Sequence, residues 1–126
     1  MAQNNYIKGD FNIFINEQCR KDMTVNDIDV VMHKYNVGYT GGKNVLRIIE
    51  SKQEHEPTMK KSQKNVHILI YKILKQANIP GYVFEHYLVR GSKPYDTVKL
   101  INILTGNTFY LGRNELIDFL DFKKQY

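Results

Sequence analysis

The architecture follows from residues that read Ile28-Asp-Val-Val-Met-His-Lys-Tyr35, then Asn36-Val-Gly-Tyr-Thr-Gly-Gly-Lys43, then Val45-Leu-Arg-Ile-Ile49. The first and last of these pieces are rich in apolar and β-branched residues, as buried strands are. The middle piece holds three glycines within eight residues, which is typical of a turn. The sequence therefore predicts a β-hairpin with strands at 28–35 and 45–49.

Outward from this hairpin, the apolar spacing predicts three helices and two further strands. Pro57 and Thr58 suit the first turn of the longest helix. These elements are expected at residues 10–20 (helix), 57–76 (helix), 82–90 (strand), 97–104 (strand) and 114–123 (helix). The expected fold is α/β (α+β), a central mixed sheet flanked by helices in the order α-β-β-α-β-β-α, in a single domain of residues 1–126.

Composition limits the classes of protein that need consideration. The 126 residues are 42% hydrophobic and 25% charged, enough for one domain with a buried core. The only cysteine, Cys19, excludes a disulfide framework and a Cys-rich zinc site. No signal-peptide pattern or bilayer-length apolar run is present, so a cytoplasmic protein with no membrane partner is expected, in the host cytoplasm if the source is viral. The many Lys, Asn, Ile and Tyr residues hint at an AT-rich genome, viral or archaeal.

The hairpin register places two acids and one lysine at the end away from the turn. With the tip at residues 38–41, counting back along both strands sets Asp29 opposite Glu50. A register shift of one residue sets Asp29 opposite Ser51, and a shift of two sets it opposite Lys52. Glu50 and Lys52 are two residues apart and therefore point to the same face of their strand.

Two carboxylates a few ångströms apart repel each other unless a cation lies between them, and oxygen ligands suit Mg²⁺ or Mn²⁺. Such a metal polarises a phosphodiester and acidifies its bound water, while a nearby lysine stabilises the negative charge of the transition state. This group of residues therefore indicates phosphodiester hydrolysis. In the alternative interpretation, Glu50 and Lys52 form an exposed ion pair that contributes less than about 1 kcal/mol.

The segment Ile28-Asp29-Val30-Val31, a glycine turn and Leu46-Arg-Ile-Ile-Glu50-Ser51-Lys52 resembles the core of the PD-(D/E)XK nucleases, the restriction-endonuclease-like superfamily. The resemblance covers about residues 10–90. It implies that Asp29 and Glu50 ligate the metal together with the Ser51 carbonyl oxygen. It also implies that Lys52 attends the attacking water.

The resemblance extends to further positions. Many relatives carry a glutamate on the first helix, for which Glu17 is the candidate and Asp10 the other option, and a glutamine on the helix after the lysine, for which Gln63 fits. Asp27 could replace Asp29 as the first ligand. The catalytic residues expected on these grounds are Asp29, Glu50, Lys52, Gln63 and Glu17.

The formal charge of +5 favours a polyanionic partner. Lys60, Lys61 and Lys64 near the start of the long helix, and Lys43 beside the glycine turn, are the expected nucleic-acid contacts. The four histidines, His33, His55, His67 and His86, show no zinc spacing and are expected to be packed or surface residues.

The expected function is that of a Mg²⁺- or Mn²⁺-dependent endonuclease that hydrolyses DNA, with structured or branched DNA among its candidate substrates. DNA is favoured over RNA. A chain of this size makes few contacts with a duplex, so a homodimer is expected, in which each subunit cuts one strand. The alternatives are a basic nucleic-acid-binding module without catalysis and a small viral or mobile-element protein that binds another protein.

Overall fold

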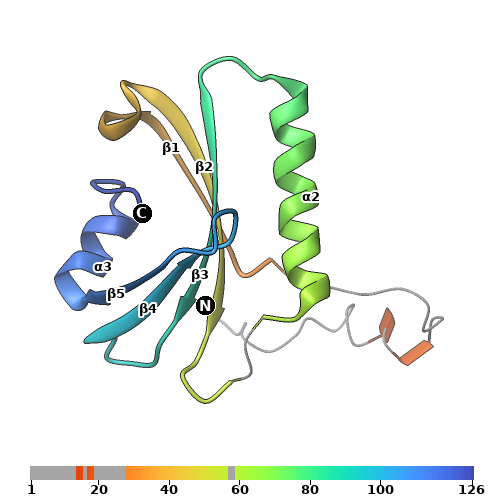
Figure 1. Cartoon of the computed structure of the whole chain (residues 1–126), viewed down its shortest axis with the longest axis vertical. Coiled ribbons are helices and arrows are strands. Elements are labelled where there is room, and N and C mark those ends of the chain that lie inside the picture. Colours follow the sequence, from red (N-terminus) through yellow and green to blue (C-terminus); the bar gives the residue numbers. More distant parts are fainter. Residues whose placement is uncertain (1–13, 16, 19–27, 57–58) are drawn as a thin grey trace.

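Five strands form one mixed sheet in the order β1-β2-β3-β4-β5 (Figure 1). The computed structural model describes residues 14–15, 17–18, 28–56 and 59–126. The elements, in chain order, are β1 (Val30–Val37), β2 (Lys43–Lys52), α2 (Lys61–Ala77), β3 (Tyr82–Arg90), β4 (Thr97–Asn102), β5 (Thr108–Gly112) and α3 (Arg113–Leu120). Strands β2 and β3 are parallel and joined through α2, while the other neighbouring strands are antiparallel.

The two helices cover opposite faces of the sheet (Figure 1). Successive side chains of a strand point to opposite faces, so β2 divides its residues between the two helices. Ile49 packs in the main core on the α3 face, whereas Glu50 faces α2. The core on the α3 face consists of Ile49, Tyr87, Val98, Leu100, Leu111, Leu116 and Phe119. The apolar core therefore lies on one face, and the acidic end of β2 opens onto the other.

A buried ion pair lies in the α3 face of the sheet. Arg47 Nε is 2.8 Å from Glu85 Oε1, and both side chains are almost fully buried. The Arg47 guanidinium also donates to the carbonyl oxygen of Phe119 and to the Tyr39 hydroxyl, which in turn donates to Glu85. Burial, and then the hydrogen bond to Glu85, raises the pKa of Tyr39. This network joins β2, β3 and α3.

The expected hairpin is present, and its turn contains one irregularity. Val30 pairs with Ile49 and Lys34 with Val45, as the mirror count requires. Near the turn, however, Val37 pairs with Lys43, where the count from a tip at 38–41 predicts Gly42. A β-bulge between Lys34 and Val37 absorbs the extra residue, so the register at the far end of the hairpin is unchanged.

The main differences from the sequence prediction are the start of the long helix and the number of strands. The long helix begins at Lys61, because Lys60 is extended and its N–H donates to the Gln63 side chain as an N-terminal cap. Residues 108–112 form a fifth strand that the expected order omitted, since a turn with Gly106 at φ 80° reverses the chain after β4. The four-strand order was therefore wrong, while the mixed α+β sheet with flanking helices is confirmed.

The expected first helix falls mostly outside the described residues. Residues 14, 15, 17 and 18 are helical, and the rest of 10–20 is not described. Among the described residues, neither α2 nor α3 combines the length and the apolar composition needed to cross a bilayer.

Candidate active site

Asp29 and Glu50 meet at the end of the hairpin away from the turn. Asp29 directly precedes β1, next to the pair formed by Val30 and Ile49, and Glu50 follows Ile49 on β2. The backbone N–H of Ser51 donates to Asp29 Oδ2 at 2.8 Å. The structure therefore brings these two acids together from two chain segments about twenty residues apart in sequence.

The electrostatics of Asp29 reflect this neighbour. Partial burial of the carboxyl group raises the pKa of Asp29 above its ordinary value of 3.8, and the Glu50 carboxylate raises it further. The Ser51 N–H and the Lys52 ammonium group act in the opposite direction, and burial and repulsion prevail. Two adjacent carboxylates of this kind favour a shared proton or a shared cation.

The Glu50 side chain contacts a residue of helix α2. The Glu50 side chain is 2% exposed, and its Oε1 lies 3.0 Å from His67 Nε2. An ionised carboxylate can only accept, so His67 Nε2 is the donor whenever Glu50 is ionised. Helix α2 therefore fixes the orientation of the Glu50 carboxylate, whereas Asp29 stands on the solvent-exposed side of the pair.

The contact continues from His67 to a second buried histidine. The Nδ1 atoms of His67 and His86 are 3.0 Å apart. Either histidine can be the donor in this contact, depending on the tautomer of each ring. Burial, and then the neighbouring His67, lowers the pKa of His86 to about 4. Within the described part of the chain, His86 Nε2 is buried without a hydrogen-bond partner.

Lys52 ends β2 on the same face as Glu50. Its backbone carbonyl accepts from Gly91 N–H at 2.9 Å, and its β3 neighbour is Arg90. The Arg90 guanidinium donates to the carbonyl oxygens of Glu54 and Glu56. The loop after β2 is therefore tied to the end of β3, which fixes the backbone that carries Lys52.

The first turn of α2 lies in the helix that carries His67. Gln63 is one turn before His67, and its Oε1 accepts from the Lys60 backbone N–H at 3.2 Å. Gln63 therefore has a capping role, and its contact with the acids stays a prediction. Lys61 and Lys64 are exposed in the same turn, at the end of α2 that follows the β2 loop.

The other predicted residues are not joined to this group. Glu17 is exposed, and no hydrogen bond or ion pair within the described residues links it to Glu50. Lys43 begins β2, seven residues before Glu50, so about 23 Å of strand separates them at ~3.3 Å per residue. Asp10 and Asp27 lie outside the described residues.

A divalent cation requires several ligand atoms that lie close together. Over the residues that the structure describes, no group of three or more His, Cys, Asp or Glu side chains is arranged to hold a metal ion. Mg²⁺ needs fewer, since it keeps several waters and is commonly held by one or two carboxylates together with substrate phosphates. Asp29 and Glu50 could supply those two carboxylates. Their oxygen atoms fit Mg²⁺ or Mn²⁺.

The histidine pair was not foreseen from sequence. His67 and His86 were expected to be unrelated packed or surface residues, and the structure places both in contact beneath Glu50. One signal was present: His67 lies one helical turn after Gln63, on the face already expected to reach the acids. His86 offered no such signal, since its approach depends on how α2 packs on β3.

Comparison with protein-family models, with curated proteins and with solved structures found no match for this chain.

Proposed function

We propose that this chain is a metal-dependent endonuclease of the PD-(D/E)XK type, with a restriction-endonuclease-like fold, that hydrolyses phosphodiester bonds of DNA. The observation that carries the proposal is the pair of adjacent carboxylates, Asp29 and Glu50, with Lys52 on the face of β2 that carries Glu50. Burial, and then repulsion by Glu50, raises the pKa of Asp29, and a bound cation would relieve that repulsion.

Each residue of the site has its own chemical role. Asp29, Glu50 and the Ser51 carbonyl oxygen would hold Mg²⁺ or Mn²⁺, which supplies a polarised phosphoryl group and an acidified water when bound. The Lys52 ammonium group orients that water or stabilises the negative charge that develops on the phosphorane. The N–H of His67 keeps the Glu50 carboxylate turned toward Asp29, as hydrogen-bonded neighbours do for metal ligands.

Further residues bind and position the substrate. Lys60, Lys61 and Lys64 lie at the start of α2, where the helix dipole and three cationic side chains attract a phosphate. Gln63 and Glu17 are assigned supporting roles by the resemblance to the family. A homodimer would allow both strands of a duplex to be cut, with one Asp29–Glu50 pair for each strand.

The proposal is tested by Mg²⁺-dependent cleavage of supercoiled plasmid and of junction DNA. Glu50→Gln and Lys52→Gln are each expected to lower the rate by 10²-fold or more, on the order of a lost electrostatic contact in the transition state. Glu54→Gln is the matched control, because Glu54 is exposed, lies in the adjacent loop and makes its hydrogen bonds through backbone atoms.

Two results would contradict the proposal. If Glu50→Gln and Lys52→Gln cut as fast as the Glu54→Gln control, these residues do not carry the chemistry. If the wild type binds DNA tightly and never cuts it in Mg²⁺ or Mn²⁺, the chain is a basic nucleic-acid-binding module, and the carboxylate pair has another purpose.

A further inference from the structure

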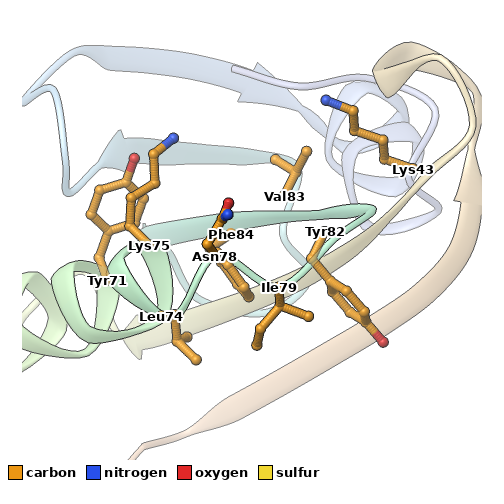
Figure 2. A pocket seen from close by; sticks show the side chains of 9 residues that line it. All are labelled: Lys43, Tyr71, Leu74, Lys75, Asn78, Ile79, Tyr82, Val83 and Phe84. Carbon is orange, nitrogen blue, oxygen red and sulfur yellow. The ribbon is translucent and has the colours of Figure 1, made fainter.

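A second candidate binding site lies at the opposite end of α2. A cavity of about 220 Å³ opens where the last turn of α2 meets the first residues of β3 (Figure 2). At ~30 Å³ per water molecule, its volume holds about seven waters, enough for one heterocyclic ring. Its polar and aromatic lining residues are Lys43, Tyr71, Lys75, Asn78, Tyr82 and Phe84.

The lining combines aromatic rings with ammonium groups. Tyr71, Tyr82 and Phe84 contribute rings, and Lys43 and Lys75 contribute positive charge. Figure 2 shows the ammonium ends of both lysines and the Asn78 amide turned to the same side of the cavity. Rings that offer a stacking surface, next to lysines that attract a phosphate, match one unpaired nucleotide of a nucleic acid.

A row of lysines runs along α2 from its first turn to this cavity. Helix α2 contains four lysines and no acidic residue. Lys61, Lys64, Lys72 and Lys75 are spaced by three or by multiples of four residues, so they share one face, and all four are exposed. Positive charge therefore lies along one face of the helix, with no acidic residue in the helix itself to offset it.

The length of this row indicates how long a strand it can contact. Fourteen residues separate Lys61 from Lys75, which corresponds to about 21 Å at 1.5 Å per residue. At 3.4 Å per nucleotide of a stacked strand, this distance spans roughly six nucleotides. A strand whose phosphate lies between Asp29 and Glu50 can thus follow the α2 lysines to the cavity.

We infer that this cavity binds an unpaired nucleotide of the strand that is cut. The inference rests on the proposed nuclease function and adds its substrate class: nucleic acid with a single-stranded segment. A base that is paired and stacked inside a duplex cannot enter a cavity between a helix and a sheet, whereas a base in a single strand can. Tyr71 supplies the stacking ring, and Lys43 and Lys75 hold the adjoining phosphates.

The test measures binding of a 12-nucleotide single strand that carries 2-aminopurine, in EDTA so that nothing is cut. In the Lys43→Gln/Lys75→Gln double variant, affinity is expected to fall about tenfold. The slope of log K against log salt is expected to lose about 1.4, at about 0.7 per phosphate contact on single strands. Lys93→Gln/Arg113→Gln removes the same charge at exposed positions that do not line the cavity and should leave the slope unchanged.

Tyr71 provides a second, independent readout. Tyr71→Leu should abolish the quenching of 2-aminopurine that stacking causes and weaken binding about tenfold, while Tyr71→Phe keeps the ring and should behave as the wild type. Equal salt slopes in the two lysine double variants, or quenching that survives in Tyr71→Leu, would overturn the inference.

Cleavage assays separate this inference from the nuclease proposal. If Glu50→Gln and Lys52→Gln abolish cleavage while the cavity variants bind single strands as the wild type does, the cavity inference fails and the nuclease proposal stands. If the cavity variants lose single-strand binding but Glu50→Gln and Lys52→Gln cut as fast as the wild type, the cavity is a nucleotide site and the nuclease proposal fails.

Discussion

The backbone N–H of Ser51 donates to Asp29 Oδ2 at 2.8 Å, so the residue between Glu50 and Lys52 is bonded directly to the acid on the neighbouring strand. This bond fixes the separation of the two strands where the carboxylates meet. It also means that one Asp29 oxygen accepts a backbone hydrogen bond. The hairpin register, and not the motion of a side chain, therefore holds Asp29 and Glu50 close enough to repel each other.

Asp29→Asn should stabilise the metal-free protein at neutral pH. The raised pKa of Asp29 means that the folded state binds this proton more tightly than the unfolded state does. Its contribution to stability is present below the unfolded pKa of 3.8 and is lost as pH rises through the higher folded value. Ionised Asp29 thus opposes folding at neutral pH, and the amide removes that repulsion while keeping an acceptor for Ser51.

The measurement is the thermal midpoint in EDTA and in Mg²⁺ at pH 7. Mg²⁺ should raise the midpoint of the wild type and leave that of Asp29→Asn nearly unchanged, since the variant has lost a ligand. Asp96→Asn, an exposed acid before β4, serves as the control. An equal rise with Mg²⁺ in all three proteins would show that the cation binds elsewhere.

His67 should affect metal affinity through Glu50. His67→Gln can still donate a hydrogen bond to the Glu50 carboxylate, whereas His67→Leu leaves a buried charge without its donor. His67→Leu is expected to weaken Mn²⁺ binding by about 10- to 100-fold, the usual effect of losing a group that orients a ligand. His67→Gln should recover most of that loss in a calorimetric Mn²⁺ titration. Identical affinities for the two variants would contradict the positioning role.

His86 should make the protein acid-sensitive. Its folded pKa of about 4 lies below the ordinary 6.5, so the unfolded state binds this proton more tightly. Stability is therefore lost as pH falls from about 6.5 toward 4, by on the order of 3 kcal/mol in total at about 1.4 kcal/mol per pKa unit. Urea unfolding of the wild type and of His86→Leu between pH 4.5 and 7.5 should show this slope in the wild type alone. A slope that persists in the variant would assign it to other groups.

The buried ion pair on the α3 face should serve stability and not cleavage. Glu85→Gln leaves Arg47 buried without its counter-charge, which is expected to cost about 3–5 kcal/mol of unfolding free energy. Because Arg47 and Glu85 face α3, cleavage per folded molecule should stay within twofold of the wild type. A variant that folds fully but has lost cleavage would place this network in the active site.

The carboxylate pair was predictable because antiparallel pairing is symmetric about the turn. Once the glycines located the tip, Asp29 had to come opposite Glu50 or one of its two successors. The bulge before Val37 was not predictable, since Asn36 at φ 54° depends on local turn geometry. Its single extra residue nevertheless cancelled the error in the tip, and the register at the far end was right.

Other features depend on packing between distant segments and leave no periodic signal. The contact of His67 with His86 requires α2 to lie across β3, which no local pattern specifies. The fifth strand is short, and its pairing with β4 follows from the turn at Gly106. The start of α2 was misplaced because Pro57 looked like a first-turn proline, whereas the observed cap is the bond from Lys60 to Gln63.

The most direct test of the central claim is the position of a bound cation. We expect anomalous diffraction from Mn²⁺-soaked crystals to place one ion in contact with a carboxylate oxygen of Asp29 and one of Glu50, at about 2.0–2.3 Å from each. The ion should disappear in crystals of Glu50→Gln. A manganese ion bound only at other side chains, or bound equally well in Glu50→Gln, would contradict the assignment of these two acids as a shared metal site.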